Sequence, residues 1–103
     1  MKLVYRPILL SDLTECADYL CLPAGEKVAA GWYQALKKAL ELIQPSPDIG
    51  RLRNDLPQTG IRTLNLRKYP NYLVFYRLEK GTIELLRIRH GLMNLVELFS
   101  EPD

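Results

Sequence analysis

The chain has 103 residues, of which 48% are hydrophobic and 25% are charged, a composition within the ordinary globular range. This length predicts a single domain, residues 1–103, built around one core. No run approaches the roughly 18 consecutive apolar residues that a membrane-spanning helix needs. The first residues show no apolar stretch followed by a small-residue cleavage site, so we expect a cytoplasmic protein that is not exported.

The formal net charge of +2 conceals an uneven distribution. Residues 51–90 hold nine basic and three acidic side chains, a balance of +6, whereas the rest of the chain holds five basic and nine acidic side chains, a balance of −4. An asymmetry of this kind concerns the partners of a protein rather than its fold. The alternative interpretation is that arginines on strands only solvate the edges of a sheet.

The first elements expected are a short strand and a helix. Lys2–Tyr5 has strand character and ends before Pro7, which cannot donate into a sheet. Asp12, with Glu15 three residues later, is close to a capping box, and apolar residues recur at helical spacing behind it. The pattern predicts a helix over residues 12–22.

A second, longer helix is expected over residues 26–44. Its apolar face is spaced at three and four residues and includes Trp32, which we interpret as a core residue. Pro45 and Pro47 stop the helix, because two prolines in three residues cannot continue it. Two amphipathic helices joined by a short break should form an antiparallel hairpin.

The second half of the chain predicts a loop and three strands. Residues 48–60 show no period and read as a basic loop. Residues 63–67 have strand character, and two further strands are expected over 72–78 and 82–89. Gly81 lies between the last two and can supply the positive φ that a short hairpin turn needs.

The last element expected is a helix over residues 92–99, where apolar residues again recur at helical spacing. The order β-α-α-β-β-β-α predicts an α+β fold, in which a helical hairpin packs on a small, mostly antiparallel sheet. The residues expected to be largely buried are Leu20, Trp32, Leu36, Phe75 and Leu86.

The end of the last strand is the candidate functional surface. Strict alternation would place Ile83, Leu85, Arg87 and Arg89 on one face, and His90, the only histidine, on the other. Two arginines should therefore leave the strand on one side with the histidine next to them. The candidate partner-binding residues are Arg51, Arg53, Arg62, Arg87, Arg89 and His90.

The sequence lacks the residues that most kinds of catalytic, metal or cofactor site require. Cys16 and Cys21 lie about 140° apart around a predicted helix, so they cannot form a disulfide, and with one histidine they do not make a metal site. No glycine-rich loop or serine elbow is present in the sequence, and we expect no cofactor. General acid–base chemistry on RNA remains as an alternative. Its candidate catalytic residues are Arg62, Arg87, Arg89 and His90.

Several short motifs together resemble one known family. They are DIGR at 48–51 after the proline-stopped helix, GIR at 60–62, NYLVFYR at 71–77 and IELLRIRHG at 83–91. With the order of elements, they look like the ParE branch of the RelE/ParE toxin superfamily. The resemblance implies a small toxin of a type II toxin–antitoxin module, held inactive by a ParD-like antitoxin.

The superfamily divides by mechanism. The resemblance implies that its ribonuclease branch, which cleaves messenger RNA on the ribosome, would have basic groups at the positions of Leu64, Leu73 and Gly91, and only Arg62 keeps one. The ParE branch instead implies inhibition of DNA gyrase by binding, without an active site. We expect a gyrase inhibitor; the alternatives are a ribonuclease toxin or an inactive module that only binds antitoxin.

Overall fold

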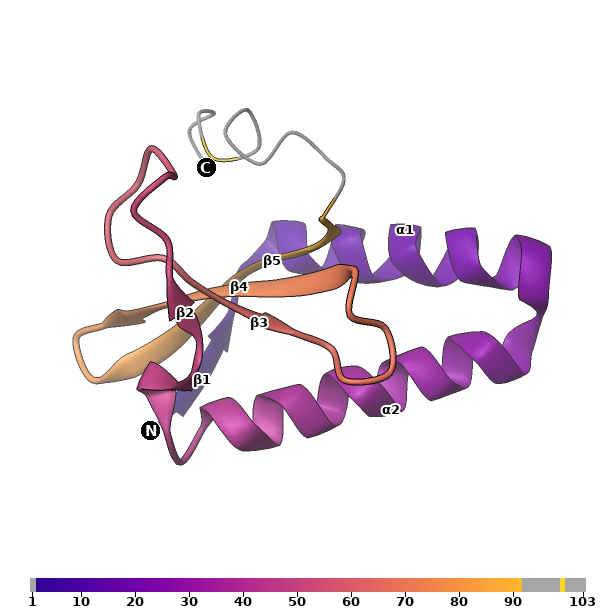
Figure 1. Cartoon of the computed structure of the whole chain (residues 1–103), viewed down its shortest axis with the longest axis horizontal. Coiled ribbons are helices and arrows are strands. Elements are labelled where there is room, and N and C mark those ends of the chain that lie inside the picture. The colour runs from indigo at the N-terminus through magenta and orange to yellow at the C-terminus, as the bar shows by residue number, and fades with distance from the viewer. Residues whose placement is uncertain (1, 92–98, 100–103) are drawn as a thin grey trace.

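A five-stranded sheet carries two long antiparallel helices on one face (Figure 1). The computed structural model describes residues 2–91 and 99, without the side chains of residues 20–24. No helix in this part of the chain is long and apolar enough to cross a membrane. The elements are β1 (Lys2–Tyr5), α1 (Pro7–Ala24), α2 (Glu26–Ile43), a 3₁₀ turn (Pro47–Ile49), β2 (Arg51–Leu52), β3 (Arg62–Asn65), β4 (Tyr72–Glu79) and β5 (Thr82–His90).

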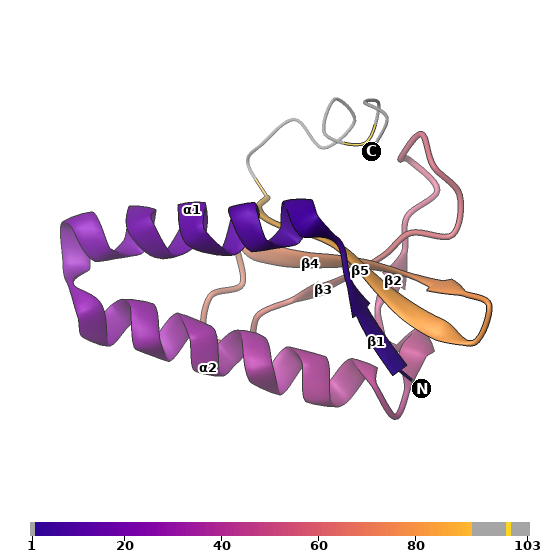
Figure 2. The same ribbon diagram turned by 180° about the vertical axis from the view of Figure 1, so that it is seen from behind.

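The sheet confirms the expected α+β class. Its strand order is β1-β5-β4-β3-β2, and every pair is antiparallel except β1–β5. The first strand therefore lies against the last one, at the edge from which α1 departs (Figure 2). Strands β4 and β5 form the expected hairpin. Its two-residue turn uses Lys80 and Gly81, both with positive φ as such tight turns require.

The helical hairpin is confirmed, but the predicted start of its first helix is wrong. Helix α1 begins at Pro7, five residues before Asp12, because proline is favoured in the first turn of a helix, where its missing N–H has no helical partner. Asp12 and Glu15 therefore do not form a capping box. The helix also runs two residues beyond the expected end, to Ala24, and the φ of 85° at Gly25 breaks it. Helix α2 ends one residue before the predicted limit.

The predicted loop over residues 48–60 contains two short elements that the sequence did not indicate. The 3₁₀ turn and β2 span only three and two residues, too few for any hydrophobic period to reveal them. Strand β2 pairs with the start of β3 and forms the second edge of the sheet. The helix expected over residues 92–99 lies outside the described residues apart from Phe99.

The sheet has a core on each face. The larger core joins α1 and α2 to the strands and includes Trp32, which is fully buried. On the other face, a smaller core contains Leu56, Ile61, Phe75, Leu86 and Phe99. The predicted burial of Trp32, Phe75 and Leu86 is confirmed, whereas Leu36 is only partly buried. Leu20 belongs to the side chains that lie outside the description.

A register shift in the central hairpin breaks the alternation expected for β5. Phe75 pairs with Arg87 but Tyr76 pairs with Leu85, so Leu86 is an extra residue, as in a β-bulge. Leu85 consequently packs in the larger core and Leu86 in the smaller one. The predicted common face of Leu85 and Arg87 is therefore wrong.

Candidate functional site

The two arginines of β5 end in a network of ion pairs with α1, which we call the Asp12 cluster: Asp12, Glu15, Arg87 and Arg89. Both oxygens of Asp12 accept hydrogen bonds from Arg87, with Nε at 2.6 Å and Nη2 at 2.8 Å. Arg89 Nη1 donates to Asp12 Oδ1 at 3.0 Å and to Glu15 Oε2 at 2.6 Å. The Asp12 side chain is 2% exposed and that of Arg89 is 9% exposed. The arginines expected at the surface are thus largely internal.

The cluster forms because β1 is shorter than β5. Strand β1 ends at Tyr5, which pairs with Leu85, so the rest of this edge of β5 has no strand beside it. Helix α1 lies there instead. Its Asp12 accepts a hydrogen bond from the backbone N–H of Ile88 at 3.2 Å, and Cys16 Sγ lies 3.8 Å from the Ile88 carbonyl oxygen. One carboxylate therefore satisfies an edge N–H and two guanidinium groups together.

Two pKa values are shifted in and beside the Asp12 cluster, those of Glu15 and Cys16. Hydrogen bonds from Arg89 and its charge lower the pKa of Glu15 below the ordinary glutamate value. Burial raises the pKa of the Cys16 thiol to about 11, so the thiol stays protonated at neutral pH. A protonated, buried thiol is a poor nucleophile and a poor metal ligand. Within residues 2–91 and 99, no three His, Cys, Asp or Glu side chains lie close enough to hold a metal ion.

His90 is held by aromatic packing. Its ring meets the ring of Tyr72 edge to face, with centroids 5.2 Å apart, and Tyr72 in turn meets Trp32 at 5.7 Å. The neighbouring Gly91 donates its N–H to the carbonyl of Asn71 at 2.6 Å. These contacts fix the strand end against the larger core.

Arg62 serves a different part of the fold. Its Nη1 donates to the carbonyl oxygen of Gly50 at 2.8 Å and to that of Asp48 at 3.3 Å. Beside it, the buried Tyr76 hydroxyl donates to the Pro47 carbonyl and accepts from the Gly50 N–H, both at 2.7 Å. Together these two side chains hold the 3₁₀ turn and Gly50, the residue before β2, against β3 and β4.

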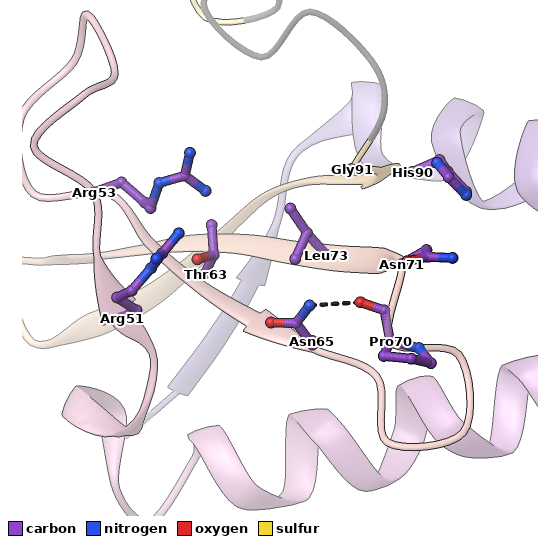
Figure 3. Close-up of a pocket in the computed structure, with 9 residues that line it drawn as sticks. All are labelled: Arg51, Arg53, Thr63, Asn65, Pro70, Asn71, Leu73, His90 and Gly91. Atoms are coloured by element: carbon purple, nitrogen blue, oxygen red, sulfur yellow. Dashed lines mark hydrogen bonds between the residues drawn. The ribbon is translucent and has the colours of Figure 1, made fainter.

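A cleft of about 560 Å³ opens on the sheet face opposite the helices. Arg51 and Arg53 stand at one end of it and His90 at the other, with Leu73 between them (Figure 3). Arg53 makes a two-pronged ion pair with Asp55, at 2.8 and 2.6 Å. Hydrogen bonding from Arg53 lowers the pKa of Asp55 to about 2. Of the two arginines that line the cleft, Arg53 is therefore already paired within the chain.

The four residues of the ribonuclease alternative do not converge on this cleft. Arg62 pairs across the sheet with Tyr76 and shares its face, whereas Arg87 pairs with Phe75 on the opposite face. Arg87 and Arg89 bind carboxylates of α1, and His90 packs on Tyr72. Of the six candidate partner-binding residues, the cleft brings together Arg51, Arg53 and His90. The sequence analysis did not identify Asp12 as a site residue. The available indication was its position on the apolar face of the helix, three residues after Leu9 and four before Cys16.

Comparison with known proteins gives the family. The sequence model described as "ParE toxin of type II toxin-antitoxin system, parDE" matches residues 3–95. The chain belongs to this ParE toxin family. It is similar to Toxin ParE3 of Caulobacter vibrioides, with 32% identity over 90 residues, which cover 87% of this chain and 85% of that protein. The expected resemblance to the ParE branch is confirmed, and the protein is a type II toxin.

A solved structure supports the fold of this ParE family member. The chain is similar to the structure titled "Chromosomal ParDE TA system from P. aeruginosa", with a TM-score of 0.74. The match covers 87% of this chain and 95% of that one at 23% identity. The helical hairpin and mixed sheet are therefore the architecture found in that toxin–antitoxin structure.

Proposed function

We propose that this ParE-family toxin inhibits DNA gyrase by binding to it, traps gyrase on cleaved DNA, and is kept silent by a ParD-like antitoxin. Such a target would place its action in the cytoplasm. The proposal needs no catalytic residue in the toxin itself. Inhibition arises when a folded surface blocks the cycle of the larger enzyme.

One observation carries the choice between gyrase inhibition and RNA cleavage. Transfer of a proton on RNA needs its acid, base and phosphate-binding cations within reach of one phosphodiester. Arg62 and Arg87 lie on opposite faces of the sheet, and Arg87 is bound to a buried carboxylate. The cleft that contains His90 has Leu73 and Gly91 along its length. This dispersion disfavours a ribonuclease centre, and membership of the ParE family supports the gyrase target.

The deciding experiment compares two targets with the same purified protein. In a supercoiling assay, the toxin should inhibit gyrase and increase the amount of linear DNA released after detergent and protease treatment. In a parallel assay with ribosomes, it should leave messenger RNA intact. Cleaved messenger RNA together with unaffected supercoiling would reject the proposal.

His90 provides a residue-level test of the same choice. Because no proton transfer depends on its imidazole, His90→Ala should weaken gyrase inhibition by less than about tenfold. General acid–base groups contribute about 10²–10⁴-fold to a catalysed rate, so a loss of toxicity in cells in that range would favour RNA cleavage. The matched control is Tyr19→Ala, which removes an exposed aromatic ring on α1. Circular dichroism of both variants should match the wild type.

A further inference from the structure

The exposed cations of the basic segment lie around the carboxyl end of β3. Four arginines in residues 51–90 already have a carboxylate partner among the described residues, namely Arg53, Arg77, Arg87 and Arg89. Arg51, Arg67 and Lys68 are exposed, and their side chains make no hydrogen bond or ion pair within the described part of the chain. These three charges are therefore available to a partner.

The edge of β3 beside these cations is open. Strand β2 pairs with β3 only as far as Thr63, so no described strand lies beside Asn65. The backbone N–H of Leu66 donates to the carbonyl of Tyr72, on the β4 side. Backbone N–H groups of a strand alternate between its two sides, so that of Asn65 is directed outward, away from β4.

Two hollows meet at Asn65. Figure 3 shows this residue in the cleft, between Arg51 and Pro70, and its amide donates to the Pro70 carbonyl at 2.5 Å. The second hollow, of about 690 Å³, lies between α2 and β3, and Lys38 lines its helical side. Among the described residues, no acidic side chain lines either hollow. We call the exposed cations of the two hollows the β3-edge strip: Arg51, Arg67, Lys68 and Lys38.

The donors of the β3-edge strip suit a phosphate backbone. Phosphate oxygens of DNA accept hydrogen bonds from arginine, lysine and asparagine side chains and from backbone N–H groups. The strip has all of these, since Asn65 and Asn71 lie beside its cations. Each DNA strand presents one phosphate per about 3.4 Å of duplex, so cations spread over α2, β2 and the β3–β4 loop can meet several phosphates. An acidic amphipathic peptide would instead need an apolar floor along both hollows, whereas the cleft is lined mainly by polar side chains.

We propose that the β3-edge strip binds the phosphate backbone of the DNA that gyrase holds, so that the toxin contacts both the enzyme and its DNA. Gyrase as the source of the DNA rests on the proposed function, whereas the phosphate chemistry rests on the strip. Contacts to phosphates carry no sequence information, so the toxin should bind DNA of any sequence equally well.

The first test measures binding of the toxin alone to a fluorescently labelled duplex, by anisotropy at increasing salt. The logarithm of the association constant should fall with the logarithm of salt concentration with a slope of about −3 to −4, because each neutralised phosphate contributes about −0.9. The quadruple strip variant should bind about tenfold or more weakly at low salt, with a slope near zero. It combines K38Q, R51Q, R67Q and K68Q.

The matched control removes the same net charge from exposed lysines that line neither hollow. It combines K2Q, K27Q, K37Q and K80Q. This variant should keep the affinity for DNA and the salt slope of the wild type. Equal losses in the two variants would show that only net charge matters and would overturn the inference.

The second test locates the DNA in the complex with gyrase. A photo-crosslinking residue at Lys68 should capture the DNA in the presence of gyrase, and one at Lys27 should not. Capture of a gyrase subunit without DNA from position 68 would assign the strip to a protein contact and reject the inference. Loss of antitoxin binding by the strip variant, with DNA binding intact, would assign the strip to the antitoxin and reject it equally.

Gyrase inhibition separates this inference from the proposed function. A wild-type toxin that binds DNA through the strip but does not inhibit supercoiling would support the phosphate site and reject gyrase as the target. A toxin that inhibits gyrase while its strip variant and control bind DNA alike would reject the phosphate site and leave the proposed function in place.

Discussion

The Asp12 cluster and three cations beside a hollow between α2 and β3 have different environments. This hollow, which we call the α2–β3 groove, is lined by the apolar Leu42, Ile49 and Leu64 and by the cations Lys38, Arg67 and Lys68. Arg87 and Arg89 meet two carboxylates of α1 and are mostly buried. Arg67 and Lys68 lie beside the apolar groove with no ion pair among the described residues. The difference shows that a surplus of arginine and lysine in a sequence does not tell which of these side chains stay exposed. That depends on where the acidic residues of the same chain lie in the fold.

The two regions should also differ in what they contribute to folding. A buried ion pair is costly to desolvate, so its presence alone does not show a large net stabilisation. Removing one partner is a different matter, because the other charge stays buried without compensation. Cations at an open rim keep most of their hydration and can be removed at little cost.

The largest effect is expected from Asp12→Ala. This substitution leaves Arg87 and Arg89 without their shared carboxylate and the Ile88 N–H without its acceptor, and it should lower the free energy of unfolding by about 3–5 kcal/mol. Urea denaturation measures the change. Asp18→Ala, at an exposed position of the same helix, is the matched control. A loss below about 1 kcal/mol, similar to the control, would show that the cluster behaves as an ordinary surface group.

A smaller effect is expected from Glu15, the exposed member of the cluster. Its folded pKa is lowered by Arg89, so its contribution to stability is complete above the unfolded value near 4.5 and is lost as the pH falls through the folded value. Glu15→Gln should therefore reduce stability at pH 7 by about 0.2–1 kcal/mol, because the side chain is 63% exposed and solvent screens the pair. Unfolding curves of the variant and the wild type should approach each other at low pH. A constant difference from pH 7 to pH 2 would contradict this assignment.

The smallest effect on folding is expected from the groove cations. Single changes Lys38→Gln, Arg67→Gln and Lys68→Gln should each alter the free energy of unfolding by less than about 0.5 kcal/mol, as usual for exposed positions without special contacts. Urea denaturation measures the free energy of unfolding of each variant. If any of them lowers stability by more than about 1 kcal/mol, that cation belongs to the fold, and the contrast with the Asp12 cluster disappears.

The long helices and strands could be predicted from the sequence because their hydrophobic periodicity extends over many residues. Helix α2 and strands β4 and β5 agree with prediction to within one residue at each end. Trp32 and Phe75 were expected in the core and are buried there. Periodicity over 8 to 18 residues is a strong signal, and these elements carry most of the larger core.

The candidate site could be predicted only in part, because its geometry depends on single residues. Leu86 is one extra residue in β5, and no pattern in the sequence marks the register shift that it causes. Asp12 looked like a helix cap because an aspartate before an apolar run usually is one. Its role became visible only once α1 was seen beside the open edge of β5. The groove depends on Lys38 and Arg67, which are 29 positions apart in the sequence.

The pairing of β1 with β5 affects how the chain can acquire its structure during synthesis. Lys2 pairs with Thr82, and Asp12 contacts Ile88 across 76 positions of sequence. Strand β1 therefore has no neighbouring strand, and Asp12 has no arginine partners, until residues 82–90 have been made. Contacts between such distant positions close slowly, because a long loop must be ordered first. The newly made chain thus has to extend through β5 before it can present the complete surface of a toxin.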